Sequence, residues 1–150
     1  MHPLSRRTAT IAAVLVAADQ LTKLIAEVGV EGSTTGPVVP LHNDELSLGL
    51  ADAASPVLAV LMALGIVVAG WWMLRRVLAG RVAPWAAAAV LAGALSNLID
   101  RAVLGSVRDF LVVPSVALTN LADVAVVAGL LGAALANARR PSLIRKEVIS

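Results

Sequence analysis

The sequence predicts an all-α membrane protein in which four helices cross the bilayer, and three observations support this. Hydrophobic residues make up 59% of the chain and charged residues 15%, against about 25% charged in ordinary globular proteins. Four apolar stretches approach the roughly 20 residues that a spanning helix needs. Lysine and arginine are concentrated in alternate connections between these stretches. The length fits one domain, residues 1–150, and a soluble domain of this size could not bury so much apolar surface.

The four predicted spans differ in the charges that they carry. We expect them at residues 8–28, 56–74, 82–99 and 118–138. The first span contains Asp19 and Lys23, the fourth contains Asp123, and the second and third contain no charge. Pro56 and Pro84 fall in or near the first turn of a helix, where a missing backbone N–H costs little.

The basic residues predict the orientation of the helices. Most of them precede the first span or lie in the second connection and the tail, so both termini should be cytoplasmic. The third connection has Arg101 and Arg108, but these stand beside Asp100 and Asp109. Trp71, Trp72 and Trp85 surround the second connection, as interfacial anchors do. The connection at 29–55 has no basic residue, and we expect it to form a small extracytoplasmic cradle of β or irregular structure. Its acidic residues are Glu31, Asp44, Glu45 and Asp52.

The composition excludes several kinds of chemistry. The chain has no cysteine, so it has no disulfide, no thiolate metal ligand and no thiol nucleophile. Its two histidines, His2 and His42, do not have the spacing of metal ligands, and we expect neither a metal nor a cofactor. The net charge of +2 is too small to predict a nucleic-acid partner.

Ionisable side chains within spans are costly and by default mark a functional site. Each of them also has a structural interpretation. Asp19 and Lys23, four residues apart on one helix face, could form a neutralising ion pair. Asp100 and Arg101 could form an ordinary pair at the end of the third helix, and Asn120 could cap the fourth helix.

Asp123 is harder to explain by structure alone, because no lysine or arginine lies near it in sequence. Such a carboxylate must be protonated, paired across helices, or exposed to a water-filled cavity. At about 1.5 Å per residue, Asp19, Lys23, Asn97 and Asp123 all lie about 18–24 Å above the inner edge of their helices. This is the outer third of a hydrocarbon core about 30 Å thick. Their common depth predicts a single polar site.

Asp109 and Asp123 together suggest a reaction. Two carboxylates held close cannot both ionise easily, so one of them keeps a proton. The ionised carboxylate can take a proton from water while its neighbour donates to a carbonyl oxygen, as in aspartic proteases. Arg108 would favour ionisation of Asp109 if their side chains approach each other, which would make Asp109 the base.

Two other functions must be weighed against this one. In a small transporter or proton-conducting subunit, Asp19, Lys23 and Asp123 would form a relay. Such a relay needs ionisable groups through the full depth of the bilayer, and the inner halves of these spans have none. A non-catalytic membrane scaffold would give no reason for having both Asp109 and Asp123.

Four motifs resemble those of the lipoprotein signal peptidases (signal peptidase II), and their order, spacing and topology match over essentially the whole chain. They are Asp-Gln-Leu-Thr-Lys at 19–23, Gly-Ala-Leu-Ser-Asn-Leu-Ile-Asp-Arg at 93–101, Val-Arg-Asp-Phe at 107–110 and Asn-Leu-Ala-Asp at 120–123. The chain departs from the family pattern at Ser96, where glycine is usual, and at Thr119, where an aromatic residue is usual. It also departs from the outer-loop pattern at 43–49.

The resemblance implies an intramembrane aspartic endopeptidase of the bacterial cytoplasmic (inner) membrane, multi-pass, with its active site facing the outer leaflet. Asp109 and Asp123 would be the catalytic dyad. The substrate would be a prolipoprotein with a diacylglyceryl-Cys, cut just before that cysteine. We expect a monomer that contacts membrane lipid, needs no cofactor and binds no nucleic acid. The residues implied to support the dyad or to bind the substrate are Asp19, Lys23, Asn43, Asn97, Arg101 and Asn120.

Overall fold

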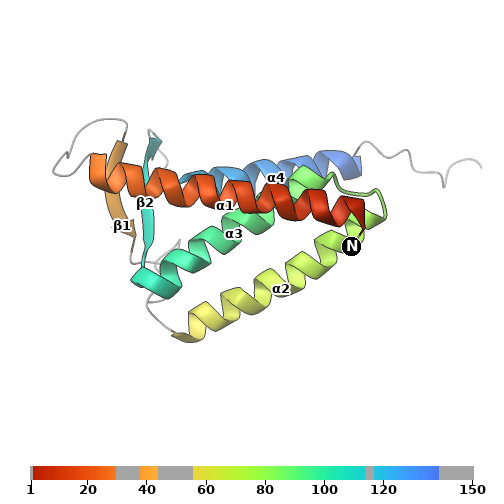
Figure 1. The fold of residues 1–150 in the computed structure, drawn as a ribbon, viewed down its shortest axis with the longest axis horizontal. Coiled ribbons are helices and arrows are strands. Elements are labelled where there is room, and N and C mark those ends of the chain that lie inside the picture. Colours follow the sequence, from red (N-terminus) through yellow and green to blue (C-terminus); the bar gives the residue numbers. More distant parts are fainter. Residues whose placement is uncertain (1, 30–37, 44–55, 114–116, 139–150) are drawn as a thin grey trace, which may run out of the picture.

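Four long helices and a small sheet make up the described part of the protein, a computed structural model that covers residues 2–29, 38–43, 56–113 and 117–138 (Figure 1). All four helices are long and apolar enough to cross a membrane. The predicted mostly helical fold with four spans is therefore confirmed. The helices are α1 (Pro3–Gly29), α2 (Pro56–Leu78), α3 (Pro84–Leu104) and α4 (Leu121–Ala138).

Prolines and a glycine mark the ends of these helices. Pro3, Pro56 and Pro84 each occupy the first position of a helix, where the absence of an N–H leaves no hydrogen bond unmade. Gly105 ends α3 with a left-handed φ of 75°, and its N–H donates to the carbonyl oxygen of Arg101. This sharp ending turns the chain directly into the next strand.

Several predicted helix boundaries are wrong, and the structure gives the reasons. α3 continues to Leu104 instead of residue 99, because the polar side chains of its last turn are held inside the protein and do not begin a solvent-exposed connection. α2 continues to Leu78, and Arg75 and Arg76 stack on tryptophan rings along its last turns. α4 begins only at Leu121, because residues 117–119 form a strand.

The sheet joins the connection before α2 to the connection before α4. Its strands are β1 (Val38–Asn43), β2 (Val107–Val113) and β3 (Ala117–Thr119), antiparallel in the order β1-β2-β3. β1 fulfils the prediction of β structure between the first two helices, whereas β2 and β3 were not predicted. In β1, Pro40 lies at the irregularity between Val38 and Leu41, a position open to proline in an edge strand. Outside the described residues lie Glu31, Asp44, Glu45, Asp52, positions 44–49 of the outer-loop pattern, and the basic tail residues Arg139, Arg140, Arg145 and Lys146.

α3 is the central helix and contacts α1, α2 and α4. Its buried face is made of small residues, which allow backbones in a membrane to approach closely. A methyl group added at Gly129 of α4 would lie 2.6 Å from the carbonyl oxygen of Ala86 in α3. α2 meets α3 where Met73, Val77 and Val82 pack with Ala86. Figure 1 shows α2 and α1 diverging toward the end of the bundle that carries the sheet.

We predict that Gly129→Ala destabilises the protein, because the added methyl group would clash with the backbone of α3. Overpacking of this kind costs about 1–3 kcal/mol, which corresponds to a fall in Tm of roughly 2–10 °C. Gly65→Ala is the matched control, since nothing lies within 4 Å of a methyl group there. Thermal unfolding in one detergent, followed by tryptophan fluorescence, measures both variants. Equal melting temperatures for the two variants would contradict close α3–α4 packing at this glycine.

Candidate functional site

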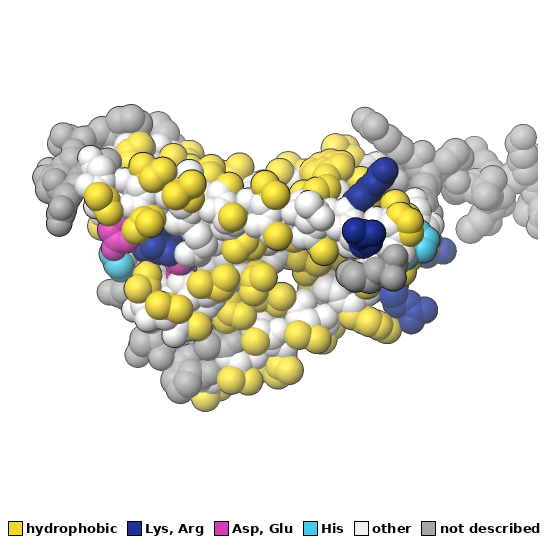
Figure 2. Space-filling view, viewed as in Figure 1, with side chains coloured by type: hydrophobic (Ala, Val, Ile, Leu, Met, Phe, Trp, Pro, Cys, Tyr) yellow, Lys and Arg dark blue, Asp and Glu magenta, His cyan; other side chains and the backbone are white. Residues whose placement is uncertain are grey.

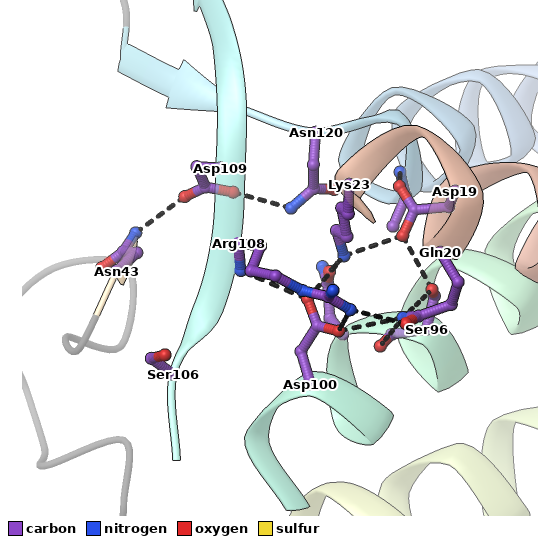
Figure 3. Close-up of polar contacts among 12 residues, drawn as sticks. Asp19, Gln20, Lys23, Asn43, Ser96, Asp100, Ser106, Arg108, Asp109 and Asn120 are labelled. Carbon is purple, nitrogen blue, oxygen red and sulfur yellow. Dashed lines mark hydrogen bonds and ion pairs between the residues drawn. The ribbon is translucent and has the colours of Figure 1, made fainter. Parts of the chain in front are cut away.

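Polar side chains from five elements meet at the end of the bundle that carries the sheet (Figure 3). They come from α1, the last turns of α3, β1, β2 and the start of α4. The structure thus brings together the groups that the sequence placed at one depth. Those that are buried at this end include Asp19, Lys23, Ser96, Asp100, Asp109 and Asn120.

Lys23 is the largest fully buried side chain in the described structure, with 1% of its surface exposed. Its Nζ lies 2.7 Å from Oδ2 of Asp19 and 3.0 Å from Oδ2 of Asp100, and it donates to Oδ1 of Asn97 at 3.0 Å. A buried ammonium is tolerated only with this kind of pairing and hydrogen bonding. The interpretation of Asp19 and Lys23 as an ion pair is confirmed, and the pair extends to a second carboxylate.

Asp100 does not form the predicted pair with Arg101. Besides Lys23, it binds Arg108, whose Nη2 donates to Oδ1 of Asp100 at 2.7 Å and to Oε1 of Gln20 at 2.6 Å. Arg108 and Asp109 are consecutive in β2, so their side chains leave opposite faces of the strand. The expectation that Arg108 favours ionisation of Asp109 is therefore wrong, because its guanidinium is bound to Asp100.

Asp109 is buried between two amide side chains. Its Oδ2 accepts from Nδ2 of Asn43 at 3.1 Å, and its Oδ1 accepts from Nδ2 of Asn120 at 2.7 Å. Burial raises the pKa of Asp109 above that of an ordinary aspartate, and the charge of Asp123 raises it further. The two amide hydrogen bonds and the charge of Lys23 oppose this shift of the Asp109 pKa without reversing it.

Asn120 joins the two aspartates of the proposed dyad. As the N-cap of α4, it accepts the backbone N–H of Asp123 with its side-chain oxygen at 2.9 Å, which confirms the predicted cap. The nitrogen of the same amide is the donor to Asp109. The N–H of Ala122, one residue before Asp123 in the first turn of α4, also lacks a partner within the helix. It donates to Oδ1 of Asp19 at 2.7 Å. A carboxylate there also interacts favourably with the helix dipole.

Asp123, which has no lysine or arginine near it in sequence, is paired across helices. Its Oδ1 accepts from Nδ2 of Asn97 at 2.8 Å, and its Oδ2 accepts from the hydroxyl of Thr119 at 3.1 Å. An ammonium has only donors, so the oxygen of Asn97 must face Lys23. The NH₂ group of Asn97 is thereby directed at Asp123, and Lys23 orients a hydrogen bond to a carboxylate that it does not contact.

Arg101 lies in the last turn of α3, close enough for the charges of Asp123, Asp109 and Asp100 to act on its guanidinium. Its Nε is buried and has no hydrogen-bond partner within the described ranges. A buried donor of this kind is normally satisfied. Arg101 therefore offers an N–H group to a ligand beside the two aspartates.

Sequence reasoning missed Gln20, Ser96 and Thr119. Gln20 donates to Oδ1 of Asp100 and to the hydroxyl of Ser96, both at 2.9 Å, and Ser96 donates to Oδ2 of Asp19 at 2.7 Å. The spacing carried a signal, since Ser96 precedes Asp100 by one helical turn. These neutral side chains complete the network that the ionisable side chains form.

Comparison with known proteins identifies the family of the chain. The family model of signal peptidase (SPase) II matches residues 11–138. This chain belongs to the signal peptidase II family. It is therefore a multi-pass membrane protease of the family that cleaves lipoprotein signal peptides. Among curated proteins no sequence match was found.

Two solved structures, each described as a bacterial membrane enzyme, share the fold. The first is 19% identical with a TM-score of 0.75, and the match covers 95% of this chain and 94% of that chain. The second is 18% identical with a TM-score of 0.70, and the match covers 89% of this chain and 94% of that chain. At this level of identity the likeness shows the fold alone.

We predict that Lys23→Met destabilises the protein strongly, because Asp19 and Asp100 lose their shared counterion inside the bundle. Breaking a buried ion pair from one side costs about 3–5 kcal/mol. Adding Asp19→Asn should restore part of the lost stability, since it removes one of the two stranded carboxylates. Thermal unfolding of the single and double variants in the same detergent provides the comparison. The assignment fails if Lys23→Met has the same melting temperature as the wild type. It also fails if the double variant has a lower melting temperature than Lys23→Met.

Proposed function

We propose that the chain is an intramembrane aspartic endopeptidase that removes the signal peptide from diacylglyceryl-modified prolipoproteins, with Asp109 and Asp123 as its catalytic dyad. One observation carries the proposal. The side-chain amide of Asn120 donates to the carboxylate of Asp109 and accepts the backbone N–H of Asp123. Asn120 thereby contacts the carboxylate of one aspartate and the backbone of the other, and the charge of Asp123 raises the pKa of Asp109.

The two carboxylates have unlike surroundings, which supports different roles. Asp109, whose pKa is raised by burial, keeps the proton. Asp123, which accepts from Asn97 and Thr119, acts as the base and takes a proton from water. The water oxygen attacks the carbonyl carbon of the scissile peptide bond while Asp109 donates its proton to the carbonyl oxygen. The tetrahedral intermediate then collapses: one of its hydroxyl groups returns a proton to Asp109, and the leaving amine takes the proton that Asp123 acquired.

The other polar residues support the dyad or bind substrate. Lys23 acts on Asp123 through Asn97, and Asp19 holds the first turn of α4. Asn43 comes from the edge strand β1, so the cradle between α1 and α2 contributes a donor to Asp109. Its position would let the cradle close over a substrate. The free Nε of Arg101 would donate to a carbonyl oxygen of the substrate's backbone or lipid ester.

The position of the site suits a lipid-linked substrate. A diacylglyceryl group holds the adjoining cysteine at the surface of the outer leaflet, and we propose cleavage just before that cysteine. A site at the ends of the helices admits water without a path through the hydrocarbon. Arginines at the opposite end of the described helices support cytoplasmic termini in a bacterial inner membrane.

We predict that Asp109→Asn and Asp123→Asn each lower kcat/KM by at least about 100-fold, since each removes a proton-transfer group. The assay is cleavage of a diacylglyceryl-modified peptide by purified protein. Glu27→Gln is the control, because Glu27 is a half-buried carboxylate near the site that contacts His42 and Arg108 and neither aspartate. It should retain activity within about twofold. A folded Asp109 or Asp123 variant with near wild-type turnover would end the dyad assignment.

The raised pKa of Asp109 predicts the pH dependence of kcat/KM. The protonated form is the active one, so activity falls as pH rises through the pKa of Asp109, which lies above the ordinary aspartate range. Asn43→Ala removes a hydrogen bond that favours the ionised form, so it should move this alkaline limb to higher pH. Profiles of kcat/KM against pH for both proteins test this. A shift of the limb to lower pH in the variant would show that Asp109 is not the proton donor.

A further inference from the structure

The turn between α2 and α3 encloses a cavity at the end of the bundle opposite the site. Its volume is about 470 Å³, and it is lined mainly by aromatic and basic side chains. The signal peptidase activity gives this cavity no role. Its lining includes Trp71, Trp72, Arg75, Arg76 and Arg81.

Two of the arginines are held in place by tryptophan rings. The guanidinium carbon of Arg75 lies 5.1 Å from the ring centre of Trp71, and that of Arg76 lies 4.6 Å from the ring centre of Trp72. Stacking over an aromatic face leaves the N–H groups at the edge of the guanidinium able to donate. The two side chains are therefore positioned before any ligand arrives.

The third arginine is positioned by the backbone of the turn. The N–H of Arg81 donates to the carbonyl oxygen of Arg76 at 2.7 Å, and that of Val82 donates to the same oxygen at 3.3 Å. Gly80 has a φ of 63°, a conformation that L side chains rarely adopt, and this closes the turn. Val77 and Val82 are buried beside it. The backbone of Arg81 is thus fixed at the end of α2, bonded to that of Arg76, and its side chain lines the same cavity.

These three cations have no carboxylate partner within the described ranges. The described carboxylates all belong to the other end of the molecule, and in Figure 2 the acidic side chains are visible only at that end. Guanidinium groups gathered around one cavity repel each other, and an anion among them would relieve this repulsion. The described carboxylates are Asp19, Glu27, Asp100, Asp109 and Asp123.

We propose that this cavity binds the phosphodiester headgroup of an anionic phospholipid. Arginine donates to phosphate oxygens through two parallel N–H groups, and basic pockets at the ends of spanning helices bind such headgroups. Trp71 and Trp72 are 61% and 43% exposed, as expected of side chains at the lipid interface. Val67 and Val68, one turn before the tryptophans in α2, are also exposed and give the acyl chains an apolar surface. A zwitterionic headgroup would bring a cation toward three guanidiniums and bind less well.

The test is native mass spectrometry of the full-length protein with equimolar phosphatidylglycerol and phosphatidylcholine of the same acyl chains. We expect at least fivefold more phosphatidylglycerol to remain bound. The double variant R76Q/R81Q should lose this preference. The matched control R6Q/R7Q removes the same charge at the same end of the bundle but outside this cavity, and it should keep the preference within twofold. Equal binding of both lipids by wild type, or equal losses in the two double variants, would overturn the proposal.

A second variant and a competitor complete the design. W72L keeps every positive charge but removes the ring under Arg76, so it should lower phosphatidylglycerol retention about threefold. Its thermal unfolding, compared with wild type, shows whether it is folded, and full retention by a folded W72L contradicts the positioning argument. Millimolar inorganic phosphate should not displace the lipid. Displacement by phosphate would identify a site for soluble anions and overturn the assignment to lipid. Because the readout is binding, it does not depend on the dyad.

Discussion

The side-chain amide of Asn120 is the contact on which the geometry of the site depends. Its oxygen caps α4 at the N–H of Asp123, and this leaves its nitrogen directed at Asp109 in β2. One side chain therefore fixes the start of a spanning helix relative to the sheet. Without it, the one side-chain donor left to Asp109 among the described residues would be Asn43, which belongs to the edge strand. The local rule that places asparagine at a helix N-cap thus also positions a carboxylate from another element.

The two ends of the bundle are stabilised by different forces. Near the α2–α3 turn, apolar side chains such as Met73 and Val77 pack around the alanines of α3. At the other end, the ammonium of Lys23 holds two carboxylates and orients an amide. In lipid, apolar packing gives little selectivity between helices, whereas a buried ion has few acceptable partners. The contacts at the polar end therefore determine how α1, α3 and α4 pack together. The same contacts position the groups proposed for catalysis.

Much of this could be read from the sequence because it follows from local rules. Counting the rise per residue put Asp19, Lys23, Asn97 and Asp123 at one depth, and the structure joins them in one hydrogen-bonded network. The partners of Asp100 and the direction of Arg108 could not be read in the same way. They depend on the pairing of β2 with β1 and β3, which brings together segments far apart in the chain. Strand pairing of this kind leaves only a weak trace in short polar connections.

The central claim is that Asp109 and Asp123 ionise as a pair. The most direct measurement is the pKa of Asp109, obtained by ¹³C NMR titration of aspartate-labelled protein in wild type and in Asp123→Asn. We expect a raised pKa for Asp109 in wild type and a lower one in the variant, because the charge of Asp123 is one of its causes. A pKa of Asp109 that does not change when Asp123 is neutralised would contradict the account.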